Sequence, residues 1–180
     1  MNRQQRSGYL LMAISALLLV LGTAGYSVSG TIDDIVTPNA PERTFFADDP
    51  LPEHTWSMFL SASVTITWER DDIYVVIVDE DEKRTCEAVP IGLINQESTT
   101  ACGPFDTDVI ASANDGDAGL IWEVQQGVYY AGIGTFQEGQ VLPEGTTVDL
   151  SYEVHLQAAF ATYFIIAIIG IGGFAYSKSE

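Results

Sequence analysis

The sequence predicts an all-β antiparallel sandwich of about seven strands, flanked by an N-terminal and a C-terminal transmembrane helix. Two observations lead to this prediction. Residues 7–32 and 156–177 contain no Asp, Glu, Lys or Arg. Between them, apolar and polar residues alternate in short segments separated by turn residues, with no helical period, as in β-sandwiches.

The C-terminal apolar segment, residues 157–176, is long enough to cross a membrane. A hydrocarbon core of about 30 Å requires about 20 helical residues, and a helix satisfies its own backbone hydrogen bonds in lipid. Gly170, Gly172 and Gly173, with Ala167, form a patch of small residues in this segment. Such a patch favours close approach of a partner helix, although glycine facing lipid is an equal alternative.

The N-terminal apolar segment, residues 9–28, is either a transmembrane helix or a secretory signal peptide. Arg3 and Arg6 precede it, as basic residues precede the apolar core of a signal peptide. The small residues at 23–25 and 28–30 only partly match a cleavage site, so a retained anchor is favoured.

The charge distribution predicts the topology of the chain in a cell membrane. Of the 25 acidic residues, 24 lie between Asp33 and Glu153, with only four basic residues among them. Basic residues mark cytoplasmic ends, which places residues 1–8 and 177–180 in the cytoplasm and the middle of the chain outside. The acidic middle also argues against a nucleic-acid partner, because phosphates would be repelled.

Residues 29–54 are expected to be an extended linker, because they contain four prolines and many polar residues. Phe45 and Phe46 interrupt this linker and are candidates for docking on the domain. Residues 55–156 then form one extracytoplasmic domain, anchored loosely at its N-terminal end and firmly at its C-terminal end. Its expected strands are 63–69, 73–78, 84–89, 105–111, 119–124, 128–136 and 148–156, with 79–82 as a turn and 119–136 as a hairpin around residues 125–127.

Cys86 and Cys102 are the only cysteines, and both fall in the extracytoplasmic portion. An oxidising compartment favours a disulfide between them. Closing a loop of this length contributes about 3 kcal/mol in the chain-entropy model. A thiolate metal site lacks the paired-cysteine spacing that such sites use.

Three stretches resemble jelly-roll sandwiches of the GOLD and pre-peptidase C-terminal type: YVVIVDEDE, GVYYAGIGTF and TVDLSYEVHL. The resemblance covers residues 55–157 and includes a Gly-x-Tyr-Tyr strand start at residues 127–130. It implies a membrane-anchored domain that binds cargo or a partner. The usual coiled coil and longer cytoplasmic tail of GOLD proteins are missing, which weakens an implied trafficking role.

No catalytic, cofactor or metal-binding residues are assigned from the sequence. His54 and His155 are the only histidines, and no serine or cysteine motif accompanies them. Asp115 and Asp117 around Gly116, and the acidic run at 79–82, invite a calcium hypothesis because hard cations prefer oxygen ligands. Solvated turns on an acidic surface are the favoured explanation of both groups, and the EF-hand spacing is not met.

We therefore expect a non-enzymatic binding or assembly protein, acting as an accessory subunit of a membrane complex. The bilayer and a membrane protein are its expected partners, the latter through the extracytoplasmic domain or the second span. The alternative is a domain that binds calcium or a glycan. A pilin-like surface subunit, suggested by Arg6-Ser7-Gly8 before the apolar run, comes third, because the glutamate usual after that junction is missing.

Overall fold

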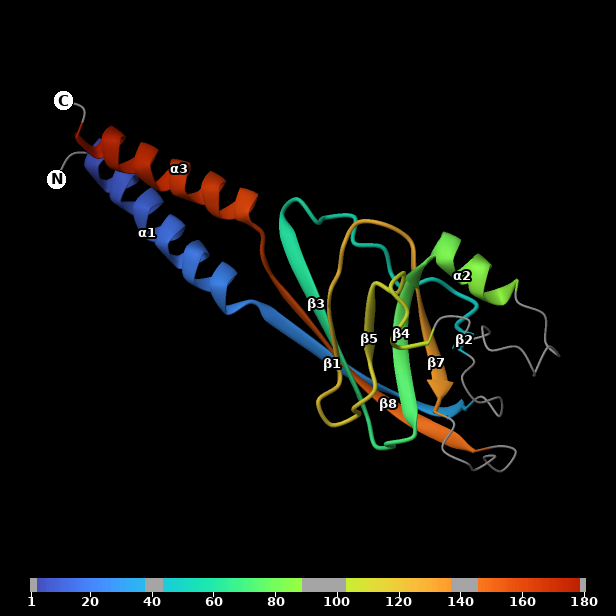
Figure 1. Cartoon of the computed structure of the whole chain (residues 1–180). Helices are drawn as coiled ribbons and strands as arrows, with labels where there is room; N and C mark the ends of the chain where they lie inside the picture. The colour runs from blue at the N-terminus through green and yellow to red at the C-terminus, as the bar shows by residue number, and fades with distance from the viewer. Residues whose placement is uncertain (1–2, 38–43, 89–102, 137–145, 179–180) are drawn as a thin grey trace. The chain divides into compact units, whose positions relative to one another are not determined.

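The computed structural model describes residues 3–37, 44–88, 103–136 and 146–178 (Figure 1). The chain divides into two compact units: residues 1–28, 55–63 and 155–180 form one, and residues 29–54 and 64–154 form the other. The elements are α1 (Arg3–Ala24), β1 (Tyr26–Val36), β2 (Phe45–Phe46), β3 (Leu60–Trp68), β4 (Ile73–Asp79), α2 (Glu80–Glu87), β5 (Ala111–Ala113), β6 (Leu120–Glu123), β7 (Tyr129–Thr135), β8 (Thr147–Ala158) and α3 (Phe160–Lys178).

The eight strands in the described part of the chain form two four-stranded sheets. The first sheet has the order β1-β8-β3-β6, and the second has the order β2-β7-β4-β5. In the second sheet β4 lies between two antiparallel partners, with Val75 opposite Ile133 of β7 and opposite Ala113 of β5. The prediction of an antiparallel sandwich is confirmed at this level, with eight strands in place of about seven.

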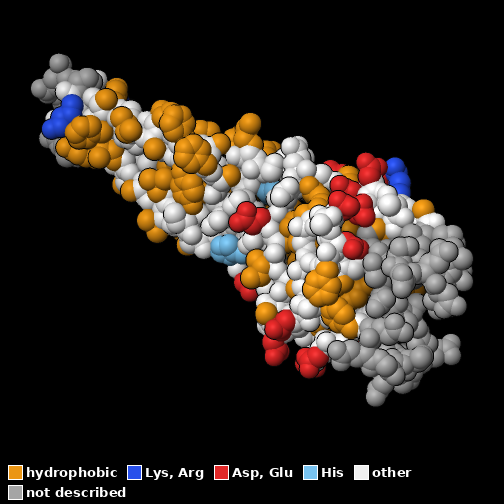
Figure 2. All heavy atoms as spheres, in the orientation of Figure 1, with side chains coloured by type: hydrophobic (Ala, Val, Ile, Leu, Met, Phe, Trp, Pro, Cys, Tyr) orange, Lys and Arg blue, Asp and Glu red, His pale blue; other side chains and the backbone are white. Residues whose placement is uncertain are grey.

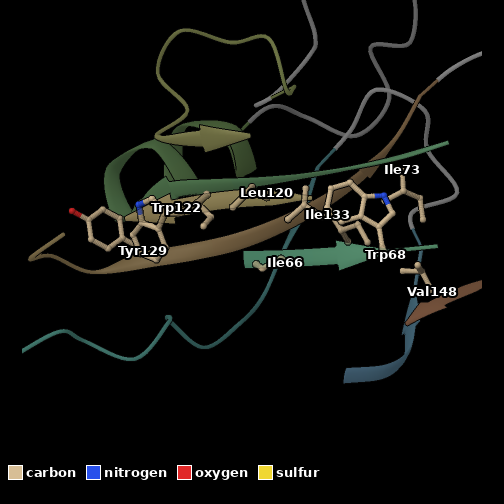
Figure 3. Packing of buried hydrophobic residues seen from close by; sticks show 10 residues of the cluster. Ile66, Trp68, Ile73, Leu120, Trp122, Tyr129, Ile133 and Val148 are labelled. Atoms are coloured by element: carbon tan, nitrogen blue, oxygen red, sulfur yellow. The ribbon is translucent and has the colours of Figure 1, made fainter. Parts of the chain in front are cut away.

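The core lies between the two sheets and draws side chains from both (Figure 3). Ile73 to Val78 of β4 are almost completely buried, as expected for a strand covered on both faces. Fully burying an aliphatic side chain contributes about 1.5–3 kcal/mol. Trp122 meets Tyr129 edge-on, with ring centroids 5.1 Å apart. The buried cluster comprises Ile66, Trp68, Ile73, Val75, Ile77, Leu120, Trp122, Tyr129, Ile133 and Val148.

Residues 80–87, expected to form the end of a turn and the start of a strand, form the helix α2 instead. Asp79 is its N-cap, and the carboxylate accepts a hydrogen bond from the Glu82 backbone N–H at 2.8 Å. Acidic residues follow in the first turn, where the helix dipole favours them, and Arg84 pairs with Glu80 one turn away. Five of its eight residues are Glu, Lys or Arg, which favour helix, and the cap, dipole and ion pair stabilise a segment too short to be helical by propensity alone.

The prediction of an extended linker at residues 29–54 is wrong, because this range contains most of β1 and all of β2. β1 is eleven residues long and neighbours β8 in the first sheet, so residues 29–36 belong to a sheet and not to a linker. The docking of Phe45 and Phe46 is confirmed, since they form β2 against Ile133 and Gly132 of β7. β1 was missed because its partner strand lies more than a hundred residues away.

One predicted hairpin and one predicted strand are also wrong, although the strands at 119–124 and 128–136 are confirmed as β6 and β7. Residues 119–136 do not form a hairpin, because β6 belongs to the first sheet and β7 to the second. The segment between them connects the two sheets, and Gly127 adopts a φ of 152° there. Residues 105–110 contain turns, and the expected strand begins only at Ala111. Asp106 ties these turns by accepting a hydrogen bond from the Gly103 backbone N–H at 2.7 Å.

Both terminal helices are long and apolar enough to cross a membrane by length and composition. They pack antiparallel through small residues spaced seven apart on α1: Gly8, Ser15 and Gly22. A Cβ placed on Gly8 would lie 2.6 Å from the Gly173 carbonyl oxygen, and one on Gly22 would lie 2.9 Å from the Ala158 Cβ. Gly170 likewise approaches Ser15, whereas Gly172 has nothing within 4 Å. The small-residue patch of the second segment therefore meets the first segment of the same chain.

Replacing the α2 cap tests its role. Asp79→Ala should lower the free energy of unfolding by about 1 kcal/mol, because the Glu82 N–H loses its acceptor. The measurement is chemical denaturation of the full chain in detergent, followed by tryptophan fluorescence. Asp81→Ala is the control: Asp81 is also in the first turn, but its side chain is 96 % exposed, and it should cost only a few tenths of a kcal/mol. Equal losses in both variants would contradict the cap assignment.

Candidate functional site

An open groove of about 370 Å³ lies on the sheet formed by β1, β8 and β3. We call it the hydroxyl groove, because most of its lining residues carry hydroxyl groups. On β3, Thr65 and Thr67 alternate with the inward-facing Ile66 and Trp68, which are buried in the core. The alternation of a strand thus places core residues on one face and hydroxyls on the other. The groove is lined by Ser29, Gly30, Thr31, Thr65, Thr67, Ser151, Tyr152 and Glu153.

Gly30 shapes this groove by giving room to Tyr152. A Cβ at residue 30 would lie 2.5 Å from the Tyr152 hydroxyl oxygen and 2.7 Å from its ring carbon Cζ. Any larger residue would push the tyrosine ring out of its place. Tyr152 also packs against the core cluster, so its ring links the groove to the interior.

A second groove of about 320 Å³ continues from the first and shares Thr67 and Ser151 with it. This part is acidic, with Glu69, Asp117 and Asp149 in its lining. Asp149 also accepts a hydrogen bond from the Asp34 backbone N–H at 2.8 Å, which secures β1 against β8. Among the described residues that line the two grooves, these three and Glu153 are carboxylates, and none is basic.

The described basic side chains of the sandwich are Arg70, Lys83 and Arg84. Each of them binds groups outside the two grooves. The Arg70 guanidinium donates from Nε to Asp72 at 2.9 Å and from Nη1 to the Thr147 carbonyl at 3.4 Å. Lys83 donates to the Ala47 carbonyl at 2.8 Å and lies 4.0 Å from the centre of the Tyr130 ring. Arg84 pairs with acids of α2. Because these cations are used internally, the grooves present a negative potential that favours cations and hydrogen-bond donors.

A second acidic group surrounds the start of α2. Burial raises the pKa of the Glu82 carboxyl above its ordinary value of 4.5, and the nearby charges of Asp108, Asp79 and Asp106 raise it further. The folded state therefore disfavours ionised Glu82. We assign no ligand to this acidic group. Its charges affect the stability of the fold around α2.

The residues singled out from the sequence do not assemble into a chemical site. Asp115 Oδ1 accepts hydrogen bonds from the backbone N–H groups of Asp117 and Ala118, both at 3.0 Å, so it closes a turn. Asp117 borders the acidic groove. Among the described residues, no group of three or more His, Cys, Asp and Glu side chains is placed to hold a metal.

Both histidines lie away from the grooves' lining. His155 Nδ1 is 2.9 Å from the Ser27 hydroxyl, where β8 runs beside β1, and His54 precedes the turn at Thr55. Cys86 is buried on α2, with 5 % of its surface exposed. Cys102 lies outside the described residues, so the disulfide with Cys86 stays a prediction.

The hydroxyl groove was missed from the sequence because it needs three strands distant along the chain. The signal available was the run of Ser and Thr at alternate positions of residues 61–67, next to strands with polar outer faces. Comparison of the chain with known protein families, curated proteins and solved structures found no match. The resemblance to GOLD-type sandwiches therefore also stays a prediction.

The raised pKa of Glu82 predicts a pH-dependent effect of Glu82→Gln. Above its folded pKa, ionised Glu82 destabilises the fold, and this penalty disappears as the pH falls through the raised folded pKa toward 4.5. The variant should therefore be more stable than the wild type at pH 7, with the difference vanishing near pH 4. Thermal unfolding of both proteins across this range measures it. Thr85→Ala on the same helix does not titrate, so its effect should be independent of pH. A stability advantage of the Glu82→Gln variant that persists at pH 4 would contradict the assignment.

Proposed function

We propose that this protein is a membrane-anchored accessory subunit whose extracytoplasmic sandwich binds a neighbouring membrane protein. Both terminal helices are retained as anchors in this proposal. The observation that carries it is how the two terminal helices pack: small residues lie in the contact between them, and large apolar residues are exposed. The groove on the sandwich supports the binding role.

The helix pair buries Gly8 and Ser15 on α1 and Gly173 and Ser177 on α3. A helix pair of a water-soluble protein buries its large aliphatic residues instead. Close contact through small residues, with aliphatic side chains turned outward, is the packing typical of helices in lipid. Figure 2 displays these apolar side chains over the helices. The exposed large residues include Leu10, Ile14, Leu17, Val20 and Leu21 of α1 and Phe164, Ile165, Ile168, Ile169 and Ile171 of α3.

The same packing favours a retained first helix over a cleaved signal peptide. Gly8 and Gly22 lie near opposite ends of α1, and both approach residues at or near α3. Cleavage would leave Gly173 and Ser177 without the surface that covers them. A pilin-like subunit would instead need α1 for packing in a filament. The contacts that α1 makes with α3 favour a membrane anchor over this role.

Antiparallel packing places Arg3 and Arg6 at the same end of the pair as Lys178. The positive-inside rule assigns that end to the cytoplasm, so the connected sandwich belongs to the outer side. The hydroxyl groove and its acidic extension then offer carboxylate and hydroxyl acceptors to a partner. Basic or amide-bearing segments of a membrane neighbour have the complementary donors. Calcium or glycan binding remains the alternative, and a glycan would use the same hydroxyls.

The anchoring is tested by fractionation and labelling. We expect the full chain to stay in the membrane after alkaline carbonate extraction and to keep its N-terminal segment by intact mass. A membrane-impermeant maleimide should label Asp48→Cys on intact cells, because residue 48 is exposed on the sandwich unit. Lys178→Cys is the matched control and should react only after permeabilisation. Release by carbonate, or labelling of both positions on intact cells, would overturn the proposal.

The binding face is tested by photo-crosslinking. A photoreactive amino acid at Thr65 should give a specific adduct with one membrane protein, whereas one at Asp81 on α2 should not. Glu153→Lys should then reduce the Thr65 adduct at least about tenfold, because a like charge would face the donors of the partner. Asp81→Lys is the charge-matched control and should leave the yield unchanged. Adducts of equal yield from both positions, or none from Thr65, would remove the groove as the binding face.

A further inference from the structure

The turn that precedes β3 exposes three large apolar side chains within four residues. Trp56 is 66 % exposed, Met58 69 % and Phe59 39 %. We call residues 55–59 the Trp56 loop. The exposure is built into a closed turn, because the Phe59 and Leu60 backbone N–H groups both donate to the Trp56 carbonyl at 2.9 Å. A rigid apolar patch of this kind marks a site of interaction with an apolar partner.

The Trp56 loop is fastened to the first turn of α3. The Phe59 carbonyl accepts hydrogen bonds from the Ala159 backbone N–H at 2.9 Å and from the Thr162 hydroxyl at 2.6 Å. The loop therefore lies at the N-terminal end of α3, opposite the end that carries Lys178. These bonds also satisfy a donor at the start of the helix, where backbone N–H groups lack partners within the helix.

Other exposed aromatic residues occur at the same end of the helix pair. Phe160, the first residue of α3, is 84 % exposed, and Tyr26, two residues after the end of α1, is 69 % exposed. α1 and α3 meet at this end, because a Cβ at Gly22 would touch Ala158 and Tyr163. The far end of α3 has its own exposed aromatic residue, Tyr176, beside Lys178.

The length between these ends matches a bilayer. The 19 residues of α3 rise about 28 Å at about 1.5 Å per residue, close to the hydrocarbon thickness of about 30 Å. Trp and Tyr are enriched where the hydrocarbon meets the headgroups, since their rings are apolar and their N–H or O–H groups need polar partners. With α3 spanning a bilayer, the Trp56 loop would lie at that depth in one leaflet and Tyr176 at that depth in the other.

We propose that the Trp56 loop is a third membrane contact, which inserts Trp56, Met58 and Phe59 into the lipid interface of the outer leaflet. It rests on the proposed anchoring by α1 and α3. The loop precedes β3, the strand that carries Thr65 and Thr67 of the hydroxyl groove. Its insertion would therefore fix the start of β3 at the interface in addition to the two helices.

The three tryptophans allow a direct test. Trp68 and Trp122 are buried in the sandwich core, with 3 % and 5 % exposure, so lipid quenchers should reach only Trp56. The full chain is reconstituted into phosphatidylcholine vesicles that contain lipids brominated at shallow or deep acyl positions. Shallow bromines should remove about a third of the emission, one tryptophan of three. Deep bromines should remove less, and aqueous acrylamide should add little quenching.

Trp56→Phe keeps an aromatic ring and should abolish the lipid-dependent quenching while the emission of the two buried tryptophans remains. Flotation of the same vesicles reports the anchoring independently. Floating protein whose Trp56 is quenched by acrylamide and not by bromine would overturn the loop contact and leave the anchoring intact. Protein that fails to float would overturn both. Bromine quenching that persists in Trp56→Phe would assign the signal to the core tryptophans and also reject the loop contact.

Discussion

The pairing of β1 with β8 joins segments more than a hundred residues apart, and both segments continue directly into the apolar helices. The Thr37 backbone N–H donates to the Thr146 carbonyl at 2.9 Å, and at the other end Ser27 meets His155 at 2.9 Å. Only Gly25 separates α1 from β1, and only Ala159 separates β8 from α3. The strand pairing therefore brings the end of α1 to the start of α3, and the glycines then allow the two helices to pack closely.

Gly25 makes the first of these connections possible. Its φ of 67° is left-handed, and its backbone N–H still donates to the Leu21 carbonyl at 3.2 Å, so it closes the end of α1 and turns the chain into β1. A side chain there would also collide with His155, since a Cβ would lie 2.7 Å from its ring. Glycine is required for conformation and for space at once.

The basic and acidic side chains of the sandwich lie in different surroundings. The described cations of the sandwich are bound to carbonyls, acids or an aromatic ring, while Glu69, Asp117, Asp149 and Glu153 line the open grooves. A surface of this kind stays soluble through its own net charge and repels anionic partners. The hydroxyl groove adds hydrogen-bonding groups to this surface, which charge alone does not provide.

Patterns of neighbouring residues are sufficient to predict the elements whose physics is local. Residues 73–78 are apolar and β-branched over a length that suits a buried strand, and the terminal segments are apolar over the length of a bilayer. The prediction of a turn and a strand at residues 79–87 was wrong although the signals there are local. The Asp79 cap and the acidic first turn indicate the start of a helix. The other features depend on contacts between residues far apart in the chain. Residues 26–36 pair with β8, β6 and β7 belong to different sheets, and Gly8 meets Gly173. Such contacts depend on the burial of the whole core and on long-range hydrogen bonding, which a pattern of neighbouring residues does not record. The groove and the Trp56 loop belong to this second group, because each joins strands or helix ends that are far apart in the chain.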